Sequence, residues 1–276
     1  EIPLRLVGSE MCIRDRAYVK SFEKYYHGNG MPLYASKALS CKELCRIAKE
    51  EGLGLDVVSG GEIYTAVQAG FPMKKVHFHG NNKTADEIRF ALESNVGKFV
   101  VDNLYELELL NEICGEVGKK ANISFRIKPG VDAHTHNFIR TGQIDSKFGF
   151  ALETGEAFEA VKKAQMYDNV NLTELHCHIG SQIFDIDPFV TAAEIMLDFM
   201  GKIHDELGIV ISELNLGGGF GIMYTKDDEP VPYENYMEKV SEAVKAKAKE
   251  HGLPVPYIFI EPGRSIVGEA GITLYK

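Results

Sequence analysis

The 276-residue sequence contains no tryptophan and only five cysteines. The cysteines form no CxxC pair, and because their number is odd they cannot all be paired within one chain; they lie at positions 12, 41, 45, 114 and 177. A zinc ribbon requires such pairs, and a disulfide framework requires an even set. We therefore expect reduced thiols.

Long apolar runs are also missing. None approaches the roughly 20 residues of a transmembrane helix, and the N-terminus lacks the apolar stretch of a signal peptide. Basic residues are outnumbered, with 30 Lys and Arg against 40 Asp and Glu, which gives a formal net charge of −10. Such a surface does not neutralise phosphates. These features predict a cytoplasmic protein that binds neither membrane nor nucleic acid.

Short strand-like runs alternate with longer amphipathic segments along the whole sequence. The segments have apolar residues at helical spacing, and the runs are rich in β-branched and aromatic residues. The predicted strands are Pro32–Lys37, Leu55–Ser59, Lys75–His79, Lys98–Asp102, Ile123–Lys128, Leu172–His178, Ile211–Leu216 and Tyr257–Ile260. The predicted helices include Cys41–Glu51, Gly61–Ala69, Ala85–Ser94, Leu104–Val117, Gly155–Gln165, Pro188–Leu207 and Tyr233–His251.

This alternation is typical of β-α units around a parallel sheet. Eight units favour a closed (β/α)8 barrel. The alternative, a doubly wound open sheet that binds a dinucleotide, requires a GxGxxG turn after the first strand, and the sequence has none there. We therefore predict an α/β protein of the TIM-barrel class.

Active sites of such barrels are built at the carboxyl ends of the strands. Here those ends carry an unusual number of chemically active residues, namely Lys37, Asp56, His77, His79, Asp102, Arg126, His176, His178, Gly217 to Gly219 and Glu261 to Arg264. Asp56, Ser59, Asp102 and Arg126 could simply satisfy one another at the barrel mouth. The others need separate interpretations.

The run GGGFG at 217–221 follows the seventh predicted strand, and Gly263 with Arg264 follows the eighth. Glycines let backbone N–H groups approach an anion, and these two loops frequently bind phosphate in barrel enzymes. A triple glycine alone would indicate only a tight turn. Together with Arg264, the run predicts a phosphate site.

Lys37 ends the first predicted strand, where its neighbours Tyr34, Ala35 and Ser36 are uncharged. Burial there would favour the neutral amine that imine formation requires. The alternative is a lysine that points to solvent. The phosphate site favours a covalently held phosphate cofactor, and Glu261 would then keep a pyridine nitrogen protonated; otherwise it is an ordinary acid at the barrel mouth.

The sequence also contains three pairs of histidines separated by one residue, His77 with His79, His134 with His136, and His176 with His178. On a strand such a pair faces one side, so one ring could stack on a cofactor or both could bind a metal. Metal-dependent barrel hydrolases place a pair on strand one and an aspartate on strand eight. This sequence has lysine and EPGR there, which disfavours a metal-dependent hydrolase.

The segment Val131–Phe150, with Arg140 and the run SKFG at 146–149, is too long for a minimal connection. Long barrel loops are often functional. We expect it to contact substrate or another subunit.

Taken together, these motifs resemble the diaminopimelate decarboxylases, which belong to the fold-type III pyridoxal-phosphate (PLP) enzymes with ornithine decarboxylase and alanine racemase. The resemblance runs from about Ala17 to the last residue. It rests on YASKA (34–38), DVVSGGE (56–62), FHGNNK (78–83), PGVDAHTH (129–136), TGQIDSKFGF (141–150), HCHIGSQIFD (176–185), GGGFG (217–221) and EPGR (261–264).

The resemblance implies an alanine racemase-like barrel that binds PLP and acts as a carboxy-lyase on meso-2,6-diaminopimelate, giving L-lysine and CO2. It implies that Lys37 holds the cofactor, that His178 stacks on its ring and that Glu261 pairs with its nitrogen. The implied roles of the other residues are phosphate binding by Ser181, Gly217, Gly218, Gly219, Gly263 and Arg264, ring orientation by Asp56 and Arg126, a homodimer contact by Lys147, and substrate carboxylate binding by Arg264.

The same resemblance sets the expected domains. Residues 17–264 would form the PLP-binding barrel and 265–276 the start of a C-terminal β-domain, while residues 1–16 match nothing in the family and are expected to be foreign to it. The family's CESGD segment does not occur in this sequence, so we expect weak turnover or none from this chain alone. Two further alternatives stay open, a decarboxylase of a related basic amino acid and a non-catalytic PLP-binding homologue.

Overall fold

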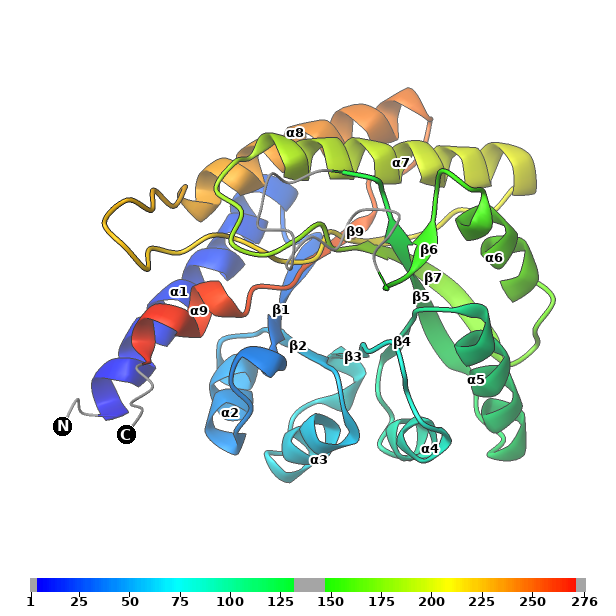
Figure 1. Ribbon diagram of the computed structural model, residues 1–276, viewed down its shortest axis with the longest axis horizontal. Coiled ribbons are helices and arrows are strands. Elements are labelled where there is room, and N and C mark those ends of the chain that lie inside the picture. The colour runs from blue at the N-terminus through cyan, green and yellow to red at the C-terminus, as the bar shows by residue number, and fades with distance from the viewer. Residues whose placement is uncertain (1–3, 132–146, 272–276) are drawn as a thin grey trace.

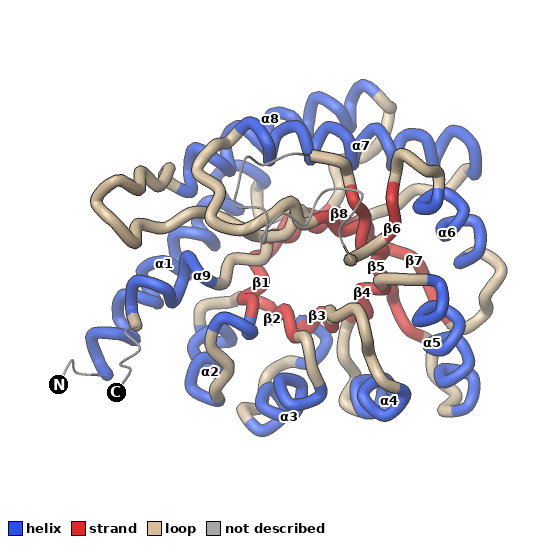
Figure 2. Tube along the Cα trace, viewed as in Figure 1, coloured by secondary structure: helices blue, strands red, loops and turns tan. Residues whose placement is uncertain are grey.

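The computed structural model describes residues 4–131 and 147–271, with side chains from Arg14 onward. Within these residues, eight parallel strands close into a barrel (Figures 1 and 2). In ring order they are β1 (Gly30–Ala35), β2 (Gly54–Val57), β3 (Val76–Phe78), β4 (Lys98–Val101), β5 (Ala121–Lys128), β7 (Val170–Cys177), β8 (Glu213–Asn215) and β9 (Tyr257–Ile260). The eight predicted strands and the closed barrel are thus confirmed.

Helices surround this barrel at the predicted places. They are α2 (Lys42–Glu50), α3 (Gly60–Gln68), α4 (Ala85–Glu93), α5 (Leu104–Glu116), α6 (Glu156–Ala164), α7 (Asp187–Leu207) and α8 (Tyr233–Glu250). Figure 1 shows α2 to α5 along one side of the barrel and the two longest of these helices, α7 and α8, packed together on the other.

Several helices begin at a polar residue that follows a strand. Ser59, Thr84 and Asn103 each accept a hydrogen bond from the backbone N–H three residues later, which satisfies a donor that the first helical turn leaves free. At Thr84 the side chain of Glu87 returns the bond, so that α4 begins with a capping box. These caps place the strand-to-helix loops at the mouth of the barrel.

Three elements were not predicted from the sequence. The strand β6 (Phe150–Ala151) pairs only with the end of β5. The helix α1 (Leu4–Tyr26) crosses the domain boundary expected after residue 16 and packs against α8 and β1. The short helix α9 (Arg264–Val267) begins at the expected phosphate-binding arginine and lies against α1.

The structure ties α1 to the barrel through polar as well as apolar contacts. Tyr18 and Phe22 are fully buried, and the Tyr18 hydroxyl lies 2.8 Å from Oγ of Ser265. Arg14 donates to the carbonyl of Ser265 and contacts Glu269. The segment before β1 therefore belongs to the same packed unit as the loop after β9.

Asp15 on α1 is 3% exposed, and its Oδ1 has no hydrogen bond. Burial, followed by the charge of Glu51, raises the pKa of Asp15 from 3.8 to about 7. Between pH 3.8 and about pH 7, unfolding therefore releases the proton that Asp15 holds in the folded state. The unfolding free energy consequently falls as the pH rises through this range. We expect Asp15→Asn to raise that free energy by about 2 kcal/mol at pH 8 and to change it little near pH 4.

Urea unfolding at both pH values measures this effect. The amide of asparagine still has a burial cost, so the gain at pH 8 is smaller than the full pKa shift would give. An equal gain at both pH values would contradict the raised pKa of Asp15.

None of the described helices combines the length and the apolar character needed to span a membrane.

Candidate active site

A cavity of about 420 Å³ opens at the mouth of the barrel, within the size range of small-molecule sites. It brings together eight of the predicted site residues, namely Lys37, His178, Ser181, Gly218, Gly219, Glu261, Gly263 and Arg264. A larger hollow of about 760 Å³ lies between α1 and the loop before α8. That hollow contains none of the predicted site residues, so we place the chemistry in the smaller cavity.

Lys37 lies in the one-turn helix η1 (Ser36–Ala38), directly after β1, rather than in the strand itself. Tyr34, Ala35 and Ser36 are buried as expected, but the side chain of Lys37 is 55% exposed. The expected burial of its amine is therefore wrong. The turn after β1 lets the side chain reach into the open cavity, where Nζ lies 3.6 Å from Oδ2 of Asp56.

Asp56 ends its strand β2 inside the barrel and is completely buried. Neither of its carboxylate oxygens makes a hydrogen bond, although Oδ1 lies 3.8 Å from Nε2 of His79. Its contacts with Lys37 and His79 are thus both longer than hydrogen bonds. The site holds a buried carboxylate whose hydrogen-bonding capacity is unused.

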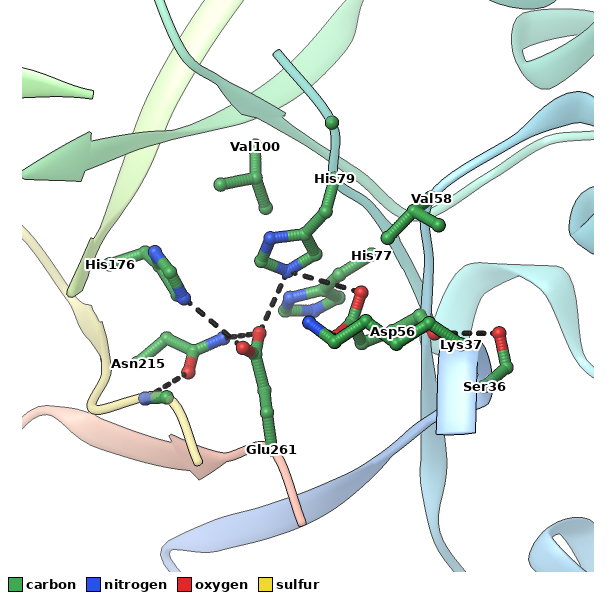
Figure 3. A network of polar contacts seen from close by, with 12 residues as sticks. Ser36, Lys37, Asp56, Val58, His77, His79, Val100, His176, Asn215 and Glu261 are labelled. Atoms are coloured by element: carbon green, nitrogen blue, oxygen red, sulfur yellow. Dashed lines mark hydrogen bonds and ion pairs between the residues drawn. The ribbon is translucent and has the colours of Figure 1, made fainter. Parts of the chain in front are cut away.

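Glu261 follows β9 and stands at the centre of a polar network (Figure 3). Its Oε1 accepts a hydrogen bond from Nδ2 of Asn215 at 2.8 Å, and its Oε2 lies 3.1 Å from Nε2 of His176. Nε2 of His79 lies 2.7 Å from Oε1, but without the alignment of a regular hydrogen bond. Asn215 in turn accepts from the backbone N–H of Gly217, which joins the acid to the glycine run.

These contacts keep Glu261 ionised although it is buried. Burial raises the pKa of Glu261, but the neighbouring His79 and His176 more than offset it and hold the pKa well below its usual range. Burial also lowers the pKa of His176, against the opposing effect of Glu261. A permanently charged carboxylate can hold a proton on a basic ring nitrogen.

The loops after β7 and β8 are joined to each other beside this network. Gln182 and Ile222 exchange two hydrogen bonds between the side-chain amide and the backbone. A backbone bridge pairs Ile183 with Phe220. Gln182 has a φ of 58°, a left-handed conformation that these contacts stabilise.

The glycine run needs glycine for steric reasons. A Cβ on Gly218 would lie 2.0 Å from the carbonyl oxygen of Glu261, and one on Gly219 would lie 2.3 Å from that of Gly180. Gly217 and Gly219 also have φ of 69° and 111°, which side chains disfavour. The run can therefore pack directly against the neighbouring strand ends, where the N–H groups of Gly217 and Gly218 donate to Asn215 and His178.

His178 lines the cavity next to this run, and the N–H of Gly218 lies 3.4 Å from its Nδ1. Burial, followed by the charges of Lys37 and Arg126, lowers the pKa of His178 well below its usual value. The ring is therefore neutral at pH 7. Its neighbour Cys177 is fully buried.

Arg264 begins α9 at the edge of the cavity. It donates one hydrogen bond to the hydroxyl of Tyr224 at 2.6 Å and another to Oγ of Ser181 at 3.2 Å. Both partners are neutral, and none of the ion pairs found within 4–131 and 147–271 involves Arg264. Its charge is therefore available to an anion in the cavity.

Arg126 on β5 points toward three buried acids. Burial lowers its pKa, and Asp102, Glu261 and Asp56 oppose this shift. Its guanidinium also lies 4.1 Å from the ring centre of Phe148. Asp102 follows β4, and burial raises its pKa. The charges of Arg126 and these acids offset one another in part, but Ser59 caps α3 and neither oxygen of Asp56 makes a hydrogen bond.

The structure brings together histidines from different sequence pairs. His79 and His176 come from different pairs, and with Glu261 they form a buried group whose ligand atoms lie within 4.8 Å of one another. His77 faces Glu174 instead, with Nδ1 3.8 Å from Oε1. The pair His134 and His136 lies outside the described residues, as does Arg140.

His79, Asn215 and Lys83 were not assigned roles from the sequence. His79 was recognisable only as a strand-end residue, and Asn215 carried no signal, since its partner Glu261 is 46 residues away. Lys83 of FHGNNK is a structural residue, because its Nζ binds Glu106 and the carbonyl oxygens of Gly80 and Val100 in a buried position.

Comparison with known proteins identifies the family to which this chain belongs. A family model described as "Pyridoxal-dependent decarboxylase, pyridoxal binding domain" matches residues 14–268. The chain belongs to the pyridoxal-dependent decarboxylases. Its cofactor is therefore PLP and its fold that of the family's barrel, rather than that of a metal-dependent hydrolase.

Curated relatives show which enzymes of this family the chain is similar to. The diaminopimelate decarboxylase of Bacillus subtilis is 52% identical over 95% of this chain and 60% of its own length. The Staphylococcus aureus diaminopimelate decarboxylase is 45% identical over 98% of the chain and 63% of its own length. The chain thus spans about three fifths of the length of these curated relatives.

Solved structures of pyridoxal-dependent decarboxylases match the barrel as well. Diaminopimelate decarboxylase from M. jannaschii superposes with a TM-score of 0.88 at 38% identity and covers 95% of this chain, while this chain covers 61% of it. A further structure of that enzyme is a complex with L-lysine. Lysine/ornithine decarboxylase from Vibrio vulnificus is more distant, at 25% identity over 92% of this chain and 62% of its own, with a TM-score of 0.74.

The residues of the cavity fit PLP. Arg264 has a charge that neutral hydroxyls leave available to a phosphate, and the glycine run lines the cavity beside it through Gly218 and Gly219. At the other side, Glu261 supplies the ionised carboxylate that a pyridine nitrogen requires, and Lys37 supplies an accessible amine. The phosphate, the ring nitrogen and the aldehyde of the cofactor therefore each match a group in a single cavity.

Proposed function

We propose that this chain is the cofactor-binding barrel of a diaminopimelate decarboxylase, which converts meso-2,6-diaminopimelate to L-lysine and CO2. The observation that carries the proposal is the 52% identity to an enzyme of that name across 95% of the chain. The 25% identity to the lysine/ornithine decarboxylase gives the related basic amino acids much weaker support.

Each predicted site residue takes a role that its surroundings support. Lys37 holds the cofactor through its amine, because it is the accessible lysine of the cavity. Glu261 pairs with the ring nitrogen, and the neutral ring of His178 provides a flat surface for stacking. Asp56 and Arg126 orient Lys37 and the ring from the buried side of the cavity.

Phosphate binding is assigned to the loops after β7, β8 and β9. Ser181, Gly218, Gly219, Gly263 and Arg264 line one edge of the cavity, and Gly217, which directly precedes Gly218, completes the set assigned to the phosphate. We also assign recognition of a substrate carboxylate to Arg264, because its guanidinium has more donors than its two hydroxyl partners use.

When bound, PLP supplies an electron sink for the carbanion that forms as CO2 leaves the D-configured carbon. The protein residues set the conditions for this chemistry. Glu261 keeps a proton on the ring nitrogen, because its own pKa is held well below the usual range. The neutral imidazole of His178 covers the ring without adding a charge to it.

We further propose that the protein acts as a homodimer in the cytoplasm. Lys147, which the resemblance places at the dimer interface, is exposed and lies 5.0 Å from the ring centre of Phe148. The cysteines at 41, 45, 114 and 177 are free thiols, which agrees with a reducing compartment.

Release of CO2 from candidate substrates tests the function. Because the relatives are longer, the assay uses this chain and also a fusion to the remaining C-terminal part of the B. subtilis enzyme. With PLP, the fusion is expected to decarboxylate meso-diaminopimelate with a kcat/KM at least about 100-fold above that for ornithine or arginine. This chain alone is expected to turn over weakly or not at all.

Equal turnover of ornithine or arginine by the fusion would show a decarboxylase of another basic amino acid. Cofactor binding without turnover of any of the three would show a non-catalytic homologue. Both results would overturn the proposed function.

A further inference from the structure

His79 lies between the two carboxylates of the cofactor site. Its Nε2 is 2.7 Å from Oε1 of Glu261 and 3.8 Å from Oδ1 of Asp56. Figure 3 shows the ring above both acids. All three side chains are at most 7% exposed, so water does not screen these contacts.

The position of the His79 ring is consistent with an Nε2–H that Glu261 and Asp56 share as acceptors. Although Nε2 is close to Glu261, it makes no aligned hydrogen bond with either acid. An N–H that faces two carboxylates is expected to lie along neither line. The edge of the ring packs against His176, with ring centres 4.8 Å apart, and this contact limits rotation away from the acids.

A second feature is the position of the two acids. Glu261 faces the ring nitrogen of the cofactor in the proposed function, whereas Asp56 contacts the amine of Lys37 at the opposite end. Nε2 of His79 contacts both acids. A single buried ring therefore bridges the two acids.

We infer that His79 is a positioning residue that holds the carboxylate of Glu261 toward the pyridine nitrogen and couples it to Asp56 beside Lys37. This inference rests on the proposed function, because it requires PLP in the cavity. Its physical basis is that donors to a carboxylate make the carboxylate less basic. The proton then stays on the ring nitrogen rather than moving to Glu261.

The test uses PLP labelled with ¹⁵N in the ring and bound to the whole chain. His79→Asn removes the donor, because the amide of asparagine is too short to reach Glu261, whereas the amide nitrogen of glutamine occupies the place of Nε2. We expect His79→Asn to move the ring ¹⁵N resonance toward that of unprotonated pyridine and to weaken PLP binding about tenfold or more. His79→Gln should restore most of both properties.

His77→Asn is the matched control. His77 is the same residue type, lies two residues earlier in β3 and is equally buried, but it contacts Glu174 and the ring of Phe259. We expect similar thermal destabilisation from both asparagine variants and an unchanged ¹⁵N position in His77→Asn.

The possible results separate the two proposals. If wild-type protein binds no labelled PLP, the proposed function fails. If wild-type protein binds PLP but His79→Asn leaves the resonance where His77→Asn leaves it, the inference about His79 is wrong and the function stands. Failure of His79→Gln to restore the signal would also overturn the donor role.

Discussion

Lys37→Ala is expected to abolish the absorption band that marks an imine between the protein and PLP. The amine of Lys37 is accessible from the cavity and is 55% exposed, and only a primary amine forms this bond. After borohydride reduction of the wild-type complex, the cofactor should be found on the peptide that contains Lys37. The variant should retain weaker, non-covalent binding, because the phosphate loops remain.

Lys42→Ala is the control for this experiment. Lys42 is exposed at the start of α2, five residues from Lys37, and does not line the cavity. It should keep the full band. Lys37 is exposed to solvent where it pairs with Asp56, and solvent weakens this ion pair. Lys37→Ala should therefore change the unfolding free energy by about 1 kcal/mol or less. Survival of the band in a folded Lys37→Ala protein would refute the assignment.

The second large effect concerns a buried ion cluster inside the barrel, below the cofactor site. Lys98 on β4 is 4% exposed and contacts Glu213 and, at 2.9 Å, the fully buried Glu174. Its Nζ also lies 5.3 Å from the ring centre of Phe259. Lys98→Met should lower the unfolding free energy by about 3–5 kcal/mol, because it leaves a buried carboxylate without its counter-ion.

Urea unfolding of single and double variants measures this effect. Lys98→Met with Glu174→Gln should recover much of the loss, since no unpaired buried charge remains, and this variant keeps the test usable if the single one does not fold. Lys163→Met is the control, because Lys163 pairs with Glu108 at the surface, and it should cost about 1 kcal/mol or less. Equal losses for Lys98→Met and Lys163→Met would show that the cluster contributes no more than a surface pair.

Much of the fold and part of the site could be predicted from local sequence patterns. Apolar periodicity identified all eight strands and the helices between them, because each element must bury one face. Strand ends then pointed to Lys37, His178, Glu261 and Arg264, since the carboxyl ends of parallel strands meet at one edge. The structure places these four residues around the same cavity.

Other features could not be predicted, because they depend on which strands face each other across the closed barrel. Asn215 and His176 meet Glu261 only after β7, β8 and β9 are in register. The expected burial of Lys37 was wrong for a different reason. The strand β1 ends at Ala35, and the turn that follows it directs the lysine into the cavity.

The sequence by itself determined the barrel, the family resemblance and the residue types of a phosphate and amine site, because these follow from periodicity and from motifs a few residues long. Only the tertiary structure decided that Lys37 is exposed, that His79 and His176 surround Glu261, and that Lys98 is paired inside the barrel. The physical reason is that burial and the pKa of Glu261 are set by side chains from strands distant in the chain, which become neighbours when the barrel closes.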